Sequence, residues 1–442
     1  MWYNKTYMLD RLKDIKTSVV SRVAAVRGGV TAPQQKHLVA LDIGTENVKA
    51  LIGRVREDGG IDIIGMGRAH QALSDMQAGA ISDIGSVVEN CDKALNDAEQ
   101  QAGVSVRSSV LGIAGELVKG TTASVRVVRK DPKKPLDIPE VERIIKLVQE
   151  RAEAKAREQL AYELGGKKIE VRLVNSALVG MEIDGYPVTN PVGFQGRDVL
   201  VQLYTAFAPL IHIGALERTA EQLDLDLVAV AAEPFGVARS VIGNDQSASF
   251  NAILIDIGGG TTDIAVVQDG GVQGTKMFGI GGRAFTRSIE RNLAVTYEQA
   301  ETLNIGLAEG KVPSKKVEEV EKALQKTLDV WISGVELALS EFTKLDHLPH
   351  HIYLCGGGSS LQLLVDRMHD SDWYTTLPFT RKPIVEHVHP EQVVGMTDTT
   401  GNVSDHTFIT AMGLLRVGLD TVQIAGAAGD SVKEKIDRIL NV

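Results

Sequence analysis

The stretch Ile255-Asp-Ile-Gly-Gly-Gly-Thr-Thr-Asp-Ile-Ala-Val266 joins a buried strand to a turn that can touch phosphate. The apolar run that leads into it, Ala252 to Ile257, is typical of a strand buried on both faces. Glycines have no Cβ, so the backbone N–H groups of the turn can approach an anion closely. A plain β-hairpin with a glycine turn would also explain this stretch alone. The residues expected to grip phosphate are Gly258, Gly259, Gly260, Thr261 and Thr262.

A second copy of this layout occurs earlier, in Leu38-Val-Ala-Leu-Asp-Ile-Gly-Thr-Glu-Asn-Val-Lys-Ala-Leu-Ile52. Here Gly44 and Thr45 stand in the turn, between an apolar strand and its returning partner. Asp42 and Asp256 each lie near a strand end, where a carboxylate can hold a hydrated Mg²⁺. The repetition predicts a duplicated architecture, with phosphates and metal clamped between the two halves.

A third glycine cluster follows a short strand in Tyr353-Leu-Cys-Gly-Gly-Gly-Ser-Ser-Leu361. A backbone without side chains allows the flat approach of a nucleoside, so we expect Gly356, Gly357 and Gly358 to line it. Three glycine loops in this order indicate one nucleotide cleft.

These motifs resemble those of the ATPase superfamily that contains actin, the heat-shock chaperone ATPases and the sugar kinases. Asp42-Ile-Gly-Thr is similar to the phosphate-1 motif, Asp256-Ile-Gly-Gly-Gly-Thr-Thr-Asp to phosphate-2, and Cys355-Gly-Gly-Gly-Ser to the adenosine motif. Ala232-Glu-Pro-Phe-Gly-Val-Ala and Thr410-Ala-Met-Gly-Leu-Leu415 resemble the two connecting helices. The resemblance implies an α/β, actin-like (ribonuclease H-like), duplicated two-lobed ATPase fold that binds ATP and Mg²⁺.

Further segments resemble the FtsA family, the bacterial actin homologues that tie the division ring to the membrane. They are Asn190-Pro-Val-Gly-Phe-Gln-Gly196, Gly279-Ile-Gly-Gly282 and Ala300-Glu301, within a match over roughly residues 37 to 420. The resemblance implies a small inserted αβ subdomain of the FtsA type (1C). Its predicted helix runs from Ile138 to Leu164, with strands at Glu170–Leu173 and Leu178–Ile183. The charges on this helix fit a solvated face better than a docking surface.

The resemblance divides the chain into lobes, an insertion and two terminal segments. We expect a basic amphipathic extension at 1–36, the first lobe at 37–104 and 209–248, and the inserted subdomain at 105–208. The second lobe, with the phosphate-2 and adenosine motifs, is expected at 249–404. The first lobe's closing helix is expected at 405–422, and a linker with a short amphipathic helix at 423–442.

Composition places the protein in a reducing, cytoplasmic compartment. The 442 residues are 43% hydrophobic and 24% charged, typical of a soluble globular protein with at least two cores. Two cysteines are too few for a disulfide framework. No apolar run reaches the length of about 18 residues that spans a bilayer, so membrane contact is expected to be peripheral.

Charge is segregated toward the N-terminus. Residues 1–36 hold seven basic and two acidic side chains, a net charge of +5, whereas the whole chain carries −10. On a helix, an apolar stripe from Met8 to Val26 would be flanked by Arg11, Lys16, Arg22 and Arg27, a pattern that suits an anionic membrane surface. The segment could instead dock on the acidic body or be a disordered arm. A C-terminal helix with Val432, Ile436, Ile439 and Leu440 on one face is shorter, so the N-terminal arm is the favoured anchor.

Site roles follow from the resemblance. Glu233 is similar to the acid that orients the attacking water, although a carboxylate that stabilises a helix N-terminus would look the same. Gly281, Gly282 and Glu301 are expected beside the nucleoside. Glu46 and Asn304 depart from the family pattern, which leaves weak hydrolysis less certain than binding.

The function implied is that of an ATP-binding cell-division protein. It would polymerise on the cytoplasmic face of the membrane, bind the FtsZ C-terminal peptide, tether the FtsZ ring and recruit later division proteins. No nucleic acid is expected as a partner. A PilM-like pilus-assembly protein is the alternative, followed by a sugar or acetate kinase.

Overall fold

The computed structural model describes residues 37–242, 250–426 and 436. All of them lie in one compact unit, Lys36–Val442. The predicted amphipathic arm at 1–36 lies outside the described residues.

The first lobe is built on a six-stranded sheet in the order β11-β6-β1-β2-β3-β17. Strands β1, β2 and β3 form an antiparallel meander, and β6 and β11 continue the sheet parallel to β1 on its other side. The bounds are β1 His37–Ile43, β2 Asn47–Val55, β3 Ile61–His70, β6 Ser108–Ile113, β11 Asp226–Ala232 and β17 Met396–Asp398. A separate two-stranded ribbon consists of β4 Met76–Gln77 and β5 Ala80–Ile81.

The second lobe repeats this topology within a nine-stranded sheet, β16-β15-β12-β13-β14-β7-β10-β8-β9. Strands β12, β13 and β14 form the meander, while β15 and β16 run parallel to β12. The bounds are β12 Ala252–Ile257, β13 Thr262–Gln268, β14 Gly271–Phe278, β15 His351–Cys355 and β16 Ile384–His387. Both lobes therefore order their strands as fifth, fourth, first, second and third, and the predicted duplication is confirmed.

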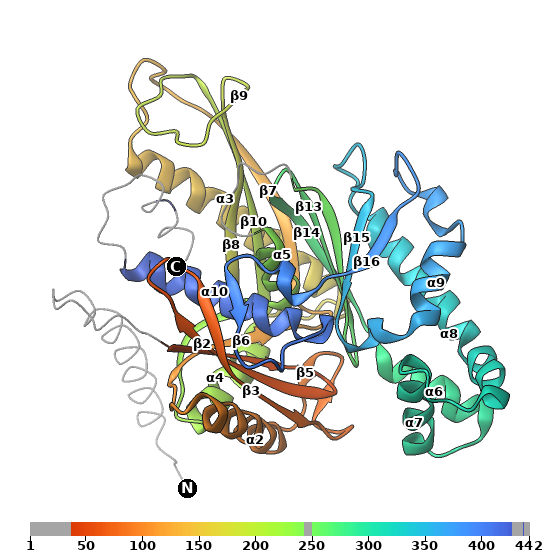
Figure 1. The fold of residues 1–442 in the computed structure, drawn as a ribbon. Coiled ribbons are helices and arrows are strands. Elements are labelled where there is room, and N and C mark those ends of the chain that lie inside the picture. The colour runs from red at the N-terminus through yellow and green to blue at the C-terminus, as the bar shows by residue number, and fades with distance from the viewer. Residues whose placement is uncertain (1–36, 243–249, 427–435, 437–442) are drawn as a thin grey trace, which may run out of the picture. The chain divides into compact units, whose positions relative to one another are not determined.

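Helices cover the sheets and enclose two apolar cores. In the first lobe, α2 and α10 lie on opposite faces of the sheet, and α5 packs along α10 (Figure 1). In the second, α8 carries the fully buried Trp331 into a core with Ile255 and Leu354. The helices are α2 Ile84–Ala102, α4 Leu210–Gln222, α5 Glu233–Ile242, α6 Gly282–Leu293, α7 Tyr297–Ala308, α8 Ser314–Ser340, α9 Gln362–Asp370 and α10 Ile409–Gly426. Short 3₁₀ turns are η1 Gly357–Ser360, η2 Trp373–Thr376, η3 Pro390–Gln392 and η4 His406–Phe408.

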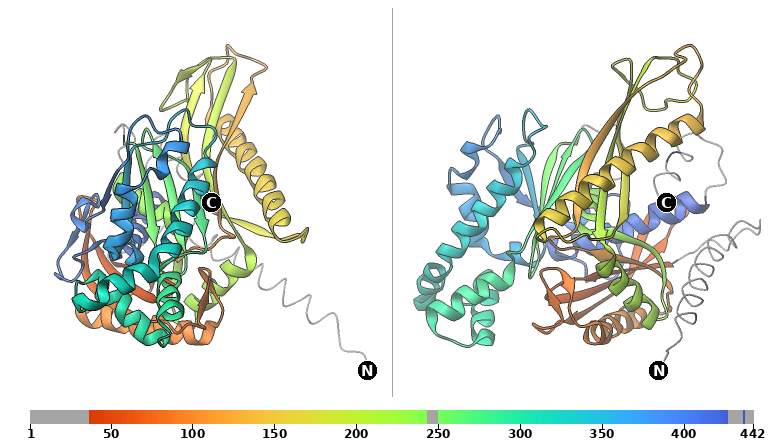
Figure 2. Two further views of the ribbon diagram at one scale, coloured as in Figure 1. Left: turned by 90° about the vertical axis from the view of Figure 1, so that its right-hand side faces the viewer. Right: turned by 180° about the vertical axis from the view of Figure 1, so that it is seen from behind.

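The inserted subdomain packs one long helix on the far strands of the second sheet (Figure 2). Helix α3 spans Ile138–Glu163, and the Asp137 side chain caps it by accepting from the Glu140 amide. The strands are β7 Lys119–Val128, β8 Val171–Ile183, β9 Tyr186–Pro187 and β10 Asp198–Pro209. Two separate strands were expected in this stretch, but β8 is continuous. Bulges in its pairing with β10 absorb the break in the apolar pattern.

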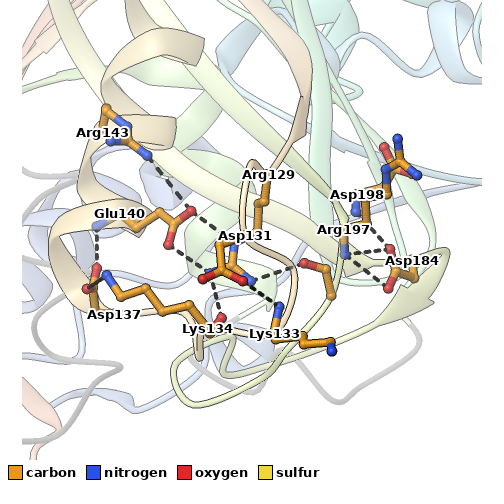
Figure 3. Close-up of polar contacts among 11 residues, drawn as sticks. Arg129, Asp131, Lys133, Lys134, Asp137, Glu140, Arg143, Asp184, Arg197 and Asp198 are labelled. Carbon is orange, nitrogen blue, oxygen red and sulfur yellow. Dashed lines mark hydrogen bonds and ion pairs between the residues drawn. The ribbon is translucent and has the colours of Figure 1, made fainter.

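Arg129 ties the loops at the tip of this subdomain together (Figure 3). Its guanidinium forms two hydrogen bonds with the Glu140 carboxylate, at 2.9 and 3.0 Å, and donates to the carbonyls of Gly196 and Lys134 at 3.1 and 2.7 Å. Arg129 is buried, and its hydrogen bonds to Glu140 lower the pKa of that carboxyl. A buried arginine with all these partners fixes the geometry of the turn between β7 and α3.

Two predicted boundaries differ from the structure. Ser108–Ile113 was assigned to the insertion, yet β6 is a fully buried strand between β1 and β11 of the first lobe. Met396–Asp398 was assigned to the second lobe, yet β17 pairs with β3. Both segments are short, so their sequence does not reveal which sheet they join.

Ile436 is the described residue of the predicted C-terminal helix. It is buried in the core of the inserted subdomain, which includes Val141, Ile145 and Val201. Val432, Ile439 and Leu440 lie outside the described residues. The Ile436 side chain is therefore engaged with the protein itself.

Candidate functional site

A cavity of about 480 Å³ lies where the hairpin turns of the two lobes meet. This volume is in the range of small-molecule sites. Both lobes contribute residues to its wall, as expected for a site that lies between two duplicated halves. The predicted residues that line it are Asp42, Gly44, Thr45, Glu233, Asp256, Gly258, Gly259, Thr261, Gly282, Glu301, Gly356, Gly357 and Gly358.

Three predicted residues do not line the cavity, and each has a structural role instead. Gly260 packs against the first lobe, where an added Cβ would lie 2.8 Å from Thr45 Oγ1. Gly281 packs on the phosphate-2 turn, where a Cβ would lie 2.5 Å from the Gly258 carbonyl oxygen. Thr262 donates to the Ile280 carbonyl and accepts from the Trp331 indole. The assignment of the Thr262 hydroxyl to phosphate is therefore corrected.

The adenosine loop meets the phosphate-2 strand closely. Gly356 has a φ of +80°, and a Cβ there would lie 2.0 Å from Asp256 Oδ1, so no other residue fits. At Gly357 a Cβ would meet nothing within 4 Å. The surface over Gly357 is open, as the approach of a nucleoside requires.

Lys49 pairs with Asp42 at the floor of the cavity. Its Nζ lies 2.9 Å from Asp42 Oδ2, and both residues line the cavity. Burial alone would lower the pKa of Lys49, but Asp42 and Asp256 outweigh it and the pKa is raised. The lysine is therefore a fixed positive charge between two carboxylates of different lobes.

Asp256 and Asp263 form the corresponding pair of the second lobe. The Thr410 hydroxyl donates to Asp256, whose pKa is nevertheless raised by burial and by Asp42. Thr261 donates to Asp263 Oδ2 at 3.0 Å, while Asp263 Oδ1 has no hydrogen-bond partner within the described ranges. Burial and the charge of Asp256 raise the pKa of Asp263 to about 8.

A shared spacing could have revealed both residues that the sequence analysis missed. Lys49 is the antiparallel partner of Asp42, and Asp263 is the antiparallel partner of Asp256. Each follows its aspartate by seven positions. The two hairpins thus pair an acidic with a basic residue in one lobe and two acidic residues in the other.

Glu233 begins α5 and lies among these groups. Its side chain lines the cavity and is buried. Burial raises its pKa well above the ordinary value, and Asp42, Asp263 and Asp256 add to the effect. These neighbours favour the protonated form of Glu233, and the charge of Lys49 opposes them.

Glu46 and Asn304, the two residues that depart from the family pattern, both line the cavity. Asn304 donates to the Thr286 hydroxyl at 3.1 Å. Burial and the neighbouring Glu46 raise the pKa of Glu301.

Within the part of the chain that the structure describes, no group of three His, Cys, Asp or Glu side chains could hold a metal ion. Asp42 and Asp256 still face one cavity from opposite lobes. Their donor set fits a cation held partly by water and phosphate oxygens, which is the usual way in which Mg²⁺ is bound. It does not fit a cage made by the protein alone.

Replacing Asp263 by Asn should change how stability depends on pH. The folded-state pKa of about 8 exceeds the ordinary 3.8, so the folded state holds a proton that the unfolded state has lost over this window. The contribution of Asp263 is full at low pH and falls as pH rises toward 8. Because Asn does not titrate, Asp263→Asn should gain stability relative to the natural protein between pH 5 and 8, by up to about 1.4 kcal/mol per unit. Denaturant unfolding of both proteins at pH 5 and at pH 8 measures this gain. A stability difference between them that is the same at both pH values would contradict the prediction.

Comparison with known proteins shows that the chain is similar to cell-division proteins. Residues 253–413 match the family model described as cell division protein FtsA. Over 404 residues the chain is 26% identical to cell division protein FtsA of Pseudomonas aeruginosa, covering 87% of this chain and 89% of that protein. The resemblance to the FtsA family is confirmed. The match to cell division protein FtsA of Bacillus subtilis is 27% identical over 266 residues, which is 60% of this chain and 56% of that protein.

A solved structure supports the fold independently of the FtsA sequences. A chain of the PilM-PilN type IV pilus biogenesis complex superposes with a TM-score of 0.63 and 17% identity, covering 88% of this chain and 99% of that chain. At this identity the likeness concerns the fold alone. With the duplicated sheet topology, it confirms the actin-like α/β fold.

Proposed function

We propose that this chain binds Mg-ATP between its lobes and works as an FtsA-type cell-division protein. It assembles into filaments on the cytoplasmic face of the membrane, tethers the FtsZ ring through the FtsZ C-terminal peptide and recruits later division proteins. The observation that carries the proposal is the convergence of Asp42, Lys49 and Asp256 on one cavity edged by glycine turns.

The charges of the cavity suit a polyphosphate. Lys49 supplies a buried positive charge, and the turns at Gly44 and Gly258 have no side chain to hinder an anion. Asp42 and Asp256 would hold Mg²⁺ through water, and the cation would offset the negative charge that gathers around Glu233. The nucleoside would lie over Gly356–Gly358.

Glu233 is the candidate for orienting water during hydrolysis. Burial and the neighbouring carboxylates raise the pKa of Glu233, and bound Mg²⁺ would favour its ionised form, which can accept a proton. Glu233→Gln should therefore retain ATP binding and lower the single-turnover rate about 100-fold. Rapid-quench measurement at saturating ATP tests this. Equal rates in the variant and the natural protein would leave Glu233 with a purely structural role.

Membrane contact is proposed to be peripheral. Within residues 37–242 and 250–426, the structure has no helix both long and apolar enough to cross a bilayer. The C-terminal helix competes poorly as an anchor because Ile436 is already buried in the inserted subdomain. The N-terminal arm, with its net charge of +5, remains the favoured contact with anionic lipids.

Deleting residues 1–30 should weaken binding to anionic vesicles more than deleting residues 430–442. Each basic side chain near such a surface contributes about 1 kcal/mol, and residues 1–30 hold six of them against three in residues 430–442. Co-sedimentation with phosphatidylserine vesicles measures the loss, and high salt should release much of the intact protein. If the C-terminal deletion alone detaches the protein, the anchor is at the other end.

Recruitment of FtsZ to vesicles tests the proposed function as a whole. FtsZ should sediment with anionic vesicles only when this protein is present, and FtsZ lacking its C-terminal peptide should stay in solution. A second candidate is a PilM-like pilus-assembly protein that binds a short peptide of a membrane partner, since such a protein would have the same fold. Failure to recruit FtsZ would favour that candidate.

A further inference from the structure

Arg283 reaches across the nucleotide cavity from one lobe to the other. It lies in the first turn of α6, in the second lobe, and its side chain is 13% exposed. Its Nε donates to Glu46 Oε2 at 2.7 Å, and its Nη2 donates to the Thr45 carbonyl at 2.6 Å. Longer contacts reach the carbonyls of Leu73 and Ala72, at 3.4 and 3.5 Å. All four acceptors belong to the first lobe.

The anchor of Arg283 in its own lobe is the phosphate-2 turn. The Arg283 amide donates to the Gly259 carbonyl at 2.8 Å, and the Gly282 amide donates to the Gly258 carbonyl at 2.9 Å. The start of α6 therefore moves with this turn. A displacement of the Arg283 guanidinium would therefore also displace the turn that forms the predicted phosphate site.

The receiving wall in the first lobe is also braced. The Gln71 amide donates to the Glu46 carbonyl at 2.9 Å, and the Gln71 side chain accepts from Asn90 at 2.9 Å. Asn90 also donates to the buried Asp75 at 3.0 Å. Arg283 thus docks on a turn that is fixed to α2, rather than on a loose loop.

Glu46 belongs to the phosphate-1 turn and packs on the phosphate-2 turn. A Cβ at Gly259 would lie 2.8 Å from the Glu46 Cβ, so the backbone of one turn packs on the side chain of the other. The Glu46 side chain is 23% exposed, and its second oxygen lies 3.6 Å from His70 Nδ1. An ion pair with this little exposure is screened much less than a surface pair.

We propose that Glu46 and Arg283 form a latch that holds the two lobes together at the phosphate turns and slows nucleotide release. The lobes cannot separate at this edge without breaking the ion pair and the contact with the Thr45 carbonyl. The slow release of nucleotide rests on the proposed ATP binding, whereas the closure of the lobes does not. Arg283 is a positioning residue in this account and takes no part in chemistry.

Hydrogen exchange in the nucleotide-free protein tests the closure. Arg283→Met keeps the length of the side chain and removes its charge and donors. Amides of residues 44–48 and 258–261 should exchange at least about 10-fold faster in this variant, which corresponds to the loss of about 1.4 kcal/mol of closure. Arg291→Met, at an exposed position in the last turn of the same helix, should exchange like the natural protein.

Dissociation of a fluorescent ATP analogue tests the effect on release. We expect release about 10-fold faster from Arg283→Met and a smaller increase from Glu46→Gln, which keeps the contact of Arg283 with the Thr45 carbonyl. The double variant should release no faster than Arg283→Met, because that substitution already breaks both contacts. If Arg283→Met does not fold, Glu46→Gln decides both readouts. Unchanged exchange at both turns would overturn the latch. If the natural protein binds no nucleotide, the proposed function fails, and the exchange result alone supports or overturns the closure.

Discussion

Replacing Asp256 by Asn is expected to weaken Mg-ATP binding about 100-fold or more and, at the same time, to raise the stability of the nucleotide-free protein. Binding weakens because one of the two carboxylates proposed to hold the hydrated Mg²⁺ is lost. Stability rises because burial and Asp42 raise the folded-state pKa of Asp256. An acid with a raised folded-state pKa loses stability as pH increases through that value, so its charge is a cost at neutral pH.

Because the affinity for Mg-ATP should fall while the stability of the protein rises, the variant distinguishes loss of the binding site from damage to the fold. Calorimetric titration with ATP and magnesium gives the affinity, and denaturant unfolding without nucleotide gives the stability. The Asn oxygen can still accept the Thr410 hydroxyl, so the local geometry is kept. Unchanged affinity would contradict the assignment of the phosphate-2 turn. Loss of stability would contradict the electrostatic account of the cavity.

Replacing Lys49 by Met is expected to abolish ATP binding and to lower the free energy of unfolding by about 3 kcal/mol. The lysine is the buried partner of Asp42, and its pKa is raised by Asp42 and Asp256 against the effect of burial. Its stabilising contribution is fully present below the ordinary pKa of 10.5, and therefore at neutral pH. Without it, Asp42 remains buried without its ion pair.

The matched control is Lys146→Met, at an exposed position of α3. It makes the same chemical change far from the cavity and should leave affinity and stability as they are. If Lys49→Met were as stable as Lys146→Met, the Lys49–Asp42 pair would contribute nothing to the fold. Lys49→Met and Asp256→Asn are thus both expected to impair ATP binding, but Lys49→Met should lower the stability of the protein and Asp256→Asn should raise it.

The turns of the site could be predicted from the sequence because their information is local. An apolar strand, an aspartate and a glycine turn specify a phosphate-binding hairpin within a dozen residues, and two copies imply the duplication. Asp42 and Asp256 do meet in one cavity. Lys49 and Asp263 could have been found from the hairpin register, which pairs each with its aspartate.

Other features depend on information that a local pattern does not hold. Thr261 and Thr262 look alike in sequence, but neighbouring residues of extended backbone point to opposite faces, so Thr261 lines the cavity and Thr262 contacts Trp331. The contact of Arg283 with Glu46 joins residues 237 positions apart. The assignment of β6 and β17 to the first sheet likewise depends on pairing partners distant in the chain.

The most direct test of the central claim is a calorimetric titration of the full chain with ATP, with and without magnesium. We expect saturable binding of one ATP per chain that is markedly tighter with magnesium, at least about 100-fold weaker in Asp256→Asn and lost in Lys49→Met. Absence of binding in the natural protein, or binding that survives both substitutions, would show that the cavity between the lobes is not a nucleotide site.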